Sequence, residues 1–210
     1  MQTTDKAAIL APFEKRVQDA NSEVAKQHAQ ACVGTVAGVV EIIKKTTLTL
    51  PNRALDPATL PLTVDLGGYT IVIEAFPGHS GTDLIVKVTE QNVVFTGDLL
   101  FNGSFPATFD EQSTISGWRN TLKTLASFDK DTIFAPGHGQ LCGQEGIALA
   151  RNVFDDIVEQ AEKMYQAGVP VSEAVDRYAI PEKFKSMPMW SWNFCIATAI
   201  TKLYAEWGGK

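Results

Sequence analysis

The stretch FPGHSGTD occupies residues 76–83 and directly follows an apolar run that is typical of a β-strand. The same arrangement recurs twice further along the chain, in TGD at residues 96–98 and in PGHG at residues 136–139. Each time, a side chain that can bind a metal stands at the end of a predicted strand with a glycine before it. We therefore expect His79, Asp98 and His138 to meet at one edge of a sheet.

These three side chains have the chemistry of a metal site. Neutral imidazole and carboxylate are ligands that Zn²⁺, Fe and Mn²⁺ accept. One such residue alone is more often a turn histidine or a capping aspartate, but three in the same setting favour a metal-binding centre. We predict that Ser80, Thr82 and Asn102 lie close by, where they support the ligands or face a substrate.

The letters GHS at residues 78–80 also match the start of the G-x-S-x-G turn that presents the nucleophile of serine hydrolases. Here Gly81 comes one position too early, and Thr82 stands where the second glycine should be. That turn must also lead into a helix, whereas the run at residues 84–88 is typical of a strand. Ser80 is therefore not expected to be a nucleophile.

The middle of the chain predicts a sheet, and its last third predicts helices. Short β-branched or aromatic runs, bounded by Gly, Pro or polar residues, lie at residues 62–66, 69–76, 84–88, 93–96 and 132–135. Helical periodicity is found near residues 115–125 and over about 144–167, 172–178 and 192–207. This order predicts an α/β fold with a mostly antiparallel sheet backed by helices.

Residues 1–47 predict a helical N-terminal segment, followed by a domain over residues 48–210. One continuous helix is favoured by apolar residues at steps of three and four: Leu10, Phe13, Val17, Ala20 and Val24. Pro12 fits such a helix only if the helix begins close to it. The segment 33–43 contains two glycines and stays open between a helix and a packed loop.

Composition narrows the class of protein. With 210 residues, 45% of them hydrophobic, the chain can bury one well-packed core. Its net charge of −6 and its lack of a basic block argue against a nucleic-acid partner, and no apolar run reaches the ~18 residues of a membrane span. Cys32, Cys142 and Cys195 are widely spaced and are expected to be free thiols. Because the start does not read as a signal peptide, a soluble, cytoplasmic protein is the default expectation.

Four stretches in this order resemble the metallo-β-lactamase superfamily: LTVDLGG at residues 62–68, PGHSGTD at 77–83, VVFTGDLLFNG at 93–103 and PGHG at 136–139. The resemblance implies an αββα sandwich and a hydrolase in which metal-bound hydroxide attacks an ester, thioester, lactam or phosphoester of a small molecule. It also implies that His79 and His138 each hold one metal, zinc or another divalent ion such as Fe or Mn. Asp98 would bridge both metals as a catalytic residue.

The sequence departs from this family at its first ligand motif. The family carries an H-x-H-x-D-H run upstream, whereas the histidine found upstream of His79 here is His28, on a helix-patterned segment where a surface residue is expected. Each metal would then lose two protein ligands, and the sandwich would be incomplete, with the C-terminal sheet and its helices present. We expect the lone chain to be weak or inactive as a hydrolase.

Three interpretations of the missing motif stay open. The chain is a fragment or truncated product of a metallohydrolase, which is the interpretation we favour, or a non-catalytic binding or regulatory protein derived from that fold. In the third, a partner completes the site between chains. Because a single sheet would leave an apolar face in water, we expect self-association or a complementing N-terminal half.

Overall fold

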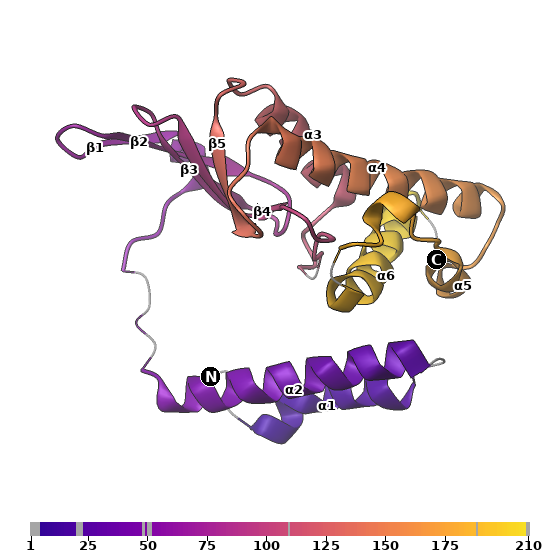
Figure 1. Cartoon of the computed structure of the whole chain (residues 1–210). Coiled ribbons are helices and arrows are strands. Elements are labelled where there is room, and N and C mark those ends of the chain that lie inside the picture. The colour runs from indigo at the N-terminus through magenta and orange to yellow at the C-terminus, as the bar shows by residue number, and fades with distance from the viewer. Residues whose placement is uncertain are drawn as a thin grey trace. The chain divides into compact units, whose positions relative to one another are not determined.

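Figure 1 shows the computed structural model of the chain, which describes residues 5–19, 23–47, 49, 52–108, 110–187 and 189–208. The chain divides into two compact units, Met1–Ala54 and Leu55–Lys210. The first unit is helical, and the second holds a sheet and the remaining helices.

The first unit is a pair of helices, α1 (Lys6–Gln18) and α2 (Glu23–Lys45). The Lys6 Nζ atom lies 3.0 Å from Glu41 Oε1, so an ion pair links the start of α1 to α2. Two hydrophobic side chains described in this unit are buried: Leu10 and Val40. Among the described side chains, the pair of helices therefore has a small core.

The expectation of one continuous helix across residues 10–24 is wrong. The first helix ends at Gln18, where the backbone N–H of the capping Asp19 donates to the Lys15 carbonyl at 2.9 Å, and Ala20 lies outside the described residues. Pro12 lies inside α1 rather than near its start, so one helical hydrogen bond is missing there. The periodic residues therefore belong to two helices.

The open segment 33–43 is helical. The second helix runs through Gly34 and Gly38, and a Cβ added at either glycine would meet nothing within 4 Å. Glycine lowers helix stability mainly through backbone entropy, and neighbouring residues with good helix propensity outweigh that cost here.

The second unit is built on a five-stranded sheet whose strand order follows the chain, β1-β2-β3-β4-β5. Its strands are β1 (Leu62–Asp65), β2 (Thr70–Phe76), β3 (Asp83–Val88), β4 (Val93–Phe101) and β5 (Ile133–His138). A short 3-10 helix at Pro57–Thr59 precedes them. Neighbouring strands pair antiparallel except β4 and β5, which pair parallel. The expected mostly antiparallel sheet is confirmed.

Two strands extend beyond their predicted ends. The fourth strand runs to Phe101 and the fifth to His138, so Asp98 lies inside β4 and His138 is the last residue of β5. The ladder between these strands shifts register between Phe95 and Gly97, and again between Gly97 and Phe101. Such irregularities interrupt the strict alternation of side chains and can turn a polar residue towards a site.

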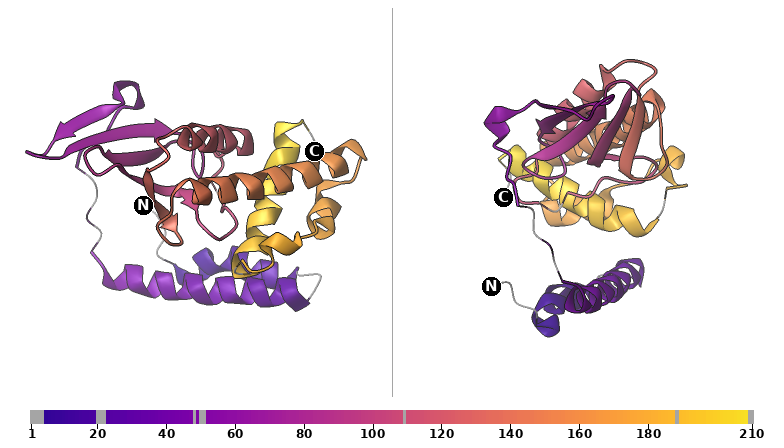
Figure 2. Two further views of the ribbon diagram at one scale, coloured as in Figure 1. Left: turned by 45° about the horizontal axis from the view of Figure 1, so that its top comes forward. Right: turned by 90° about the vertical axis from the view of Figure 1, so that its left-hand side faces the viewer.

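Helices pack on one face of this sheet at β4 (Figure 2), and β1 extends beyond them (Figure 1). The helices of the second unit are α3 (Ile115–Ala126), α4 (Gln144–Gln166), α5 (Val171–Arg177), a 3-10 helix at Glu182–Phe184 and α6 (Met189–Glu206). The core lies where α3 and α4 pack on β4, and α6 extends it against α4 and α5. Among the described residues, no helix combines the length and the apolar character that a membrane span requires.

The opposite face of the sheet is apolar, and we call it the open face. Residues paired across the strands share a face, and on this side they are Leu62, Val64, Ile71, Ile73, Ala75, Leu84, Val86, Val88, Val93, Phe95, Ile133 and Ala135. Leu84, Phe95 and Ile133 are 43%, 49% and 45% exposed, whereas Ile85, Val94 and Phe134 on the helix-covered face are fully buried. The second unit therefore forms half of an αββα sandwich, as the sequence predicts.

Candidate metal centre

The structure brings His79, Asp98 and His138 together. His79 lies in the loop after β2, Asp98 inside β4 and His138 at the end of β5. Asp98 stands between the two imidazoles and turns a different oxygen to each. Its Oδ2 atom lies 3.7 Å from His79 Nε2, and its Oδ1 atom lies 3.5 Å from His138 Nε2.

These distances fit ligands of a metal better than a direct hydrogen bond, which is typically 2.7–3.2 Å long. Two ligands about 2.1 Å from a tetrahedral ion lie about 3.4 Å apart. Each histidine and the Asp98 oxygen facing it therefore match two corners of one coordination shell. The set does not close around a single ion: within the described residues, no group of three or more His, Cys, Asp or Glu side chains is arranged to hold a metal.

The imidazole of His79 is held in one orientation by the chain. Its Nδ1 atom lies 2.8 Å from the Ala107 carbonyl oxygen. Because a carbonyl can only accept, Nδ1 must carry the hydrogen and donate it. This leaves the lone pair of Nε2 directed towards Asp98, which is the tautomer that a metal ligand needs.

Two buried aromatic rings support both imidazoles from behind, and we call Phe101 and Trp118 the aromatic floor. The Phe101 ring is stacked on His138, with centroids 4.6 Å apart and an interplanar angle of 14°. The Trp118 ring meets His79 edge-on at 5.8 Å, and its Nε1–H donates to the Leu99 carbonyl at 2.8 Å. Sequence reasoning identified both rings only as apolar residues, because their role depends on how β4 lies against β5 and α3.

Strands β4 and β5 can bring Asp98 and His138 close together because Gly137, the residue before His138, lies against Asp98. A Cβ built at Gly137 would collide with the Asp98 carboxylate, so no larger residue fits this approach. Asn102 fixes the other side: its backbone N–H donates to the His138 carbonyl, and its Nδ2 donates to the Gln140 carbonyl, both at 2.9 Å.

The supporting residues expected from the sequence therefore differ in their roles. Asn102 is next to the centre and holds the end of β5 in place. The Ser80 hydroxyl donates to Asp83 Oδ1 at 2.9 Å, which directs it into its own loop rather than towards Asp98. Thr82 is exposed. His28 lies on α2, but its side chain is outside the described residues, so its expected surface position stays a prediction.

The cysteines do not add to this centre. Cys32 and Cys142 are free thiols. Burial raises the pKa of the Cys142 thiol, and the nearby carboxylate of Glu145 raises it further, so the thiol is held in its protonated form. A protonated thiol is a poor metal ligand and a poor nucleophile.

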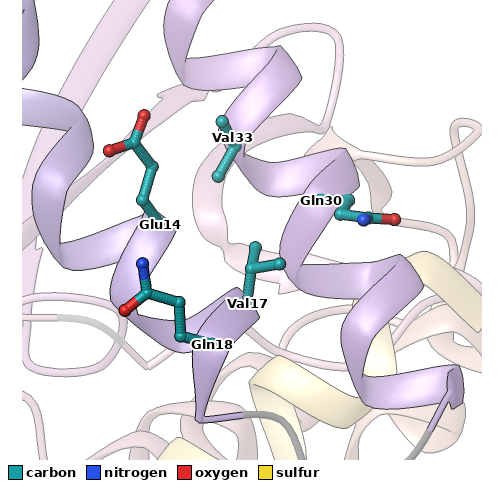
Figure 3. A pocket seen from close by; sticks show the side chains of 5 residues that line it. All are labelled: Glu14, Val17, Gln18, Gln30 and Val33. Atoms are coloured by element: carbon teal, nitrogen blue, oxygen red, sulfur yellow. The ribbon is translucent and has the colours of Figure 1, made fainter.

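A hollow of about 360 Å³ lies between α1 and α2 in the first unit (Figure 3). The side chains that line it are Glu14, Val17, Gln18, Gln30 and Val33. It has one carboxylate and no imidazole or thiol, so it lacks a set of groups for metal binding or nucleophilic chemistry.

Known proteins resemble this chain over part of its length. A model of the metallo-beta-lactamase superfamily matches residues 54–138. An uncharacterised protein of Mycobacterium tuberculosis (strain ATCC 25618 / H37Rv) is 32% identical over 84 residues, which cover 36% of this chain and 37% of that protein. A metallo-beta-lactamase type 2 of Bacteroides fragilis is 25% identical over 127 residues, which cover 59% of this chain and 50% of that protein. The chain thus spans half or less of the length of these relatives.

A solved structure extends the likeness to most of the fold. The stereoselective inverting sec-alkylsulfatase of a Pseudomonas species matches with a TM-score of 0.57 at 15% identity, covering 78% of this chain and 27% of that one. At this identity the likeness concerns the fold alone. The family match runs from the loop before β1 to His138 and contains all three residues of the candidate centre. Residues 54–138 therefore belong to the metallo-β-lactamase superfamily, and the fold around them is metallo-β-lactamase-like.

Proposed function

We propose that this chain carries part of the catalytic centre of a metal-dependent hydrolase and binds a divalent metal, zinc before iron or manganese, at His79, Asp98 and His138. The observation that carries the proposal is the single Asp98 carboxylate between two imidazole Nε2 atoms, at 3.7 and 3.5 Å. Each distance is that of two neighbouring ligands around an ion, with one ion position on each side of Asp98. Membership of the superfamily over residues 54–138 supports hydrolysis as the reaction class.

The chemistry would be that of water activation. A bound divalent metal lowers the pKa of its water towards about 7 and so supplies hydroxide at neutral pH. The proposed substrates are small molecules with an ester, thioester, lactam or phosphoester group. His79 donates from Nδ1 to the Ala107 carbonyl, which leaves its Nε2 lone pair free for a metal. Asp98 turns one carboxylate oxygen towards His79 and the other towards His138. The aromatic floor excludes water behind the imidazoles.

We further propose that the lone chain holds metal weakly. Each ion position has two protein ligands among the described residues, whereas catalytic zinc sites usually have three. Turnover should therefore stay near background unless a complementing N-terminal half or a second chain adds ligands. We also propose the expected reducing, cytoplasmic compartment, because Cys32 and Cys142 are free thiols. The absence of a closed ligand group from the described residues favours the alternative of a non-catalytic binding or regulatory protein.

Zinc titration by calorimetry, beside metal analysis after dialysis, tests the proposal. We expect weak zinc binding. Asp98→Asn should reduce it at both ion positions, whereas His79→Ala and His138→Ala should each reduce it at one. His28→Ala is the matched control, since His28 is the third histidine of the sequence and is not among the proposed ligands. Nitrocefin, thioester and phosphoester hydrolysis are measured on the same preparations.

Each outcome decides between the alternatives. Zinc binding that the three substitutions reduce and His28→Ala leaves unchanged supports the metal centre. Binding that no substitution affects, or no binding at all, favours the non-catalytic alternative. Tight stoichiometric zinc with turnover lost in His79→Ala would contradict the weak-site proposal and imply ligands other than these three.

A further inference from the structure

We propose that the open face of the sheet is the interface of a symmetric dimer of this chain. The large hydrophobic residues that are exposed in the described part of the second unit gather on this side: Leu66, Tyr69, Leu84, Phe95, Ile133 and Leu141. Leu84, Phe95 and Ile133 belong to the open face by strand register. This concentration on one surface is a stronger signal than scattered exposed residues, which are normal on any protein.

The other exposed residues extend the open face at both edges. The backbone N–H of Leu66 donates to the Tyr69 carbonyl across the β1–β2 hairpin, so alternation places both side chains on the same side as Val64 and Ile71. Cys142 pairs with the buried Phe134 in an isolated β-bridge. Leu141 directly precedes Cys142, so alternation turns the Leu141 side chain to the side opposite Phe134. The apolar surface thus continues from the hairpin to the segment after β5.

The charge pattern favours a second copy as the occupant. Each chain carries a net charge of −6, so two copies repel each other over most of their surfaces. In a two-fold interface the same patch serves both partners, and any charge on it would be repeated across the axis. The strand positions of the open face carry no charge, and Glu74 and Lys87 belong to the other face by register. Two copies can therefore meet here without desolvating an ion.

The area is sufficient for a weak dimer. The five strands lie about 4.8 Å apart, and a run of about seven residues with a rise of about 3.3 Å per residue sets their length. The face of the sheet is therefore on the order of 500 Å². Two copies packed face to face, with the sheets about 10 Å apart, would bury on the order of 1,000 Å². This is the lower end for a specific interface, so we expect a monomer–dimer equilibrium rather than a permanent dimer.

The test is light scattering after size-exclusion chromatography of the full chain, from about 1 to about 300 μM, a range that covers weak dimers. We expect the mass to rise from 22.8 kDa towards twice that value with concentration. Phe95→Lys places a charge on the open face and should weaken the dimer by at least about tenfold, because each copy would then bury an unpaired charge in the interface. Ile133→Lys repeats the change on the edge strand, where the fold tolerates it more easily.

Ile42→Lys is the matched control, because Ile42 is 65% exposed on α2 and the change is the same type. Circular dichroism checks that each variant is folded. Dimerisation that is lost with either sheet variant and kept in Ile42→Lys supports the proposal. A monomer at every concentration would overturn it. A dimer lost only in Ile42→Lys would also overturn it, because the contact would then lie at the apolar residues exposed on α2. A dimer that survives both sheet substitutions would also overturn it.

Discussion

Phe101 shows how a residue that is no ligand can control the candidate centre. Its ring is stacked on His138 at 4.6 Å and lies 6.1 Å from the ring of His79. The sequence places Phe101 in an apolar run, and only the parallel register of β4 and β5 reveals its contact with His138. The three ligand candidates could be predicted from the glycines before them, but the residues that orient them could not.

We expect Phe101→Leu to weaken zinc binding about three- to tenfold, since an aromatic stack contributes about 0.5–1.5 kcal/mol beyond burial. Leucine keeps most of the apolar volume, so the fold should survive the change. Competition between the protein and a chelator measures the affinity. Phe128→Leu is the control, because Phe128 packs near Phe134 with centroids 6.3 Å apart and belongs to no contact of the centre. Equal losses in both variants would contradict the role given to Phe101.

At the scale of single elements, α3 depends on a residue far along the chain. The Glu206 carboxylate accepts hydrogen bonds from the backbone N–H groups of Ile115 at 2.6 Å and Ser116 at 3.2 Å, at the first turn of α3. A carboxylate at this end satisfies free N–H groups and interacts favourably with the helix dipole. The same helix carries Trp118, so the capping contact also positions the aromatic floor.

Glu206→Ala should lower the free energy of unfolding by about 1–2 kcal/mol, because two backbone donors lose their partner. Urea denaturation followed by circular dichroism measures this change. Glu159→Ala is the control, because Glu159 pairs with the exposed Lys163 one turn away on the surface of α4, and exposed pairs contribute little. An unchanged midpoint in Glu206→Ala would show that the C-terminal helix does not support α3.

The start of α4 predicts a dependence of stability on pH. A hydrogen bond from the Gly143 backbone N–H, 2.7 Å long, lowers the pKa of Glu145 below its ordinary value of 4.5. Because the folded pKa is the lower one, the ionised carboxylate stabilises the fold above pH 4.5, and this contribution is lost as the pH falls through the folded pKa.

Glu145→Ala should therefore lower the urea midpoint at pH 7, and the difference from the parent chain should shrink as the pH falls towards about 3. Glu162→Ala on the same helix is the comparison, since its carboxylate accepts from the Gln166 side chain at 3.3 Å instead of a backbone N–H. A difference for Glu145→Ala that is the same at both pH values would contradict this account.

The elements were largely predictable, but only some of their ends were. The run Gly168-Val169-Pro170 predicts where α4 stops, and the helix does end at Gln166. By contrast, α1 ends at Gln18 although the apolar periodicity continues, because the pattern of two successive helices can match that of one. The fourth strand continues past Gly97 to Phe101, since pairing with β5 outweighs the low strand propensity of glycine and aspartate.

At the scale of the whole molecule, the two units differ in how much they bury. The helices α2 and α4 each have 23 residues, but α4 buries a full stripe that includes Ile147, Phe154 and Ile157. The first unit has Leu10 and Val40 as its buried hydrophobic side chains among those described. Local stability follows buried apolar contact, so the two helices should open with very different free energies.

Hydrogen exchange read by mass spectrometry checks this difference on the full chain. We expect central amides of α4 to exchange at least about a hundredfold more slowly than those of α2, because α4 opens only with the core. The equal lengths of the two helices make the comparison direct. Equal protection would show that a partner or another part of the protein covers α2.

The strand order has a consequence for how the protein folds during its synthesis. Each strand pairs with the one that precedes it in the chain, from β1 to β5. Such local pairing lets the sheet assemble while the ribosome is still adding residues, since no strand must wait for a distant partner. The helices α4 and α6 emerge later, so for a time the nascent sheet has both faces in water. During that interval translation speed and chaperone capture, rather than final stability, decide how much of the chain escapes aggregation.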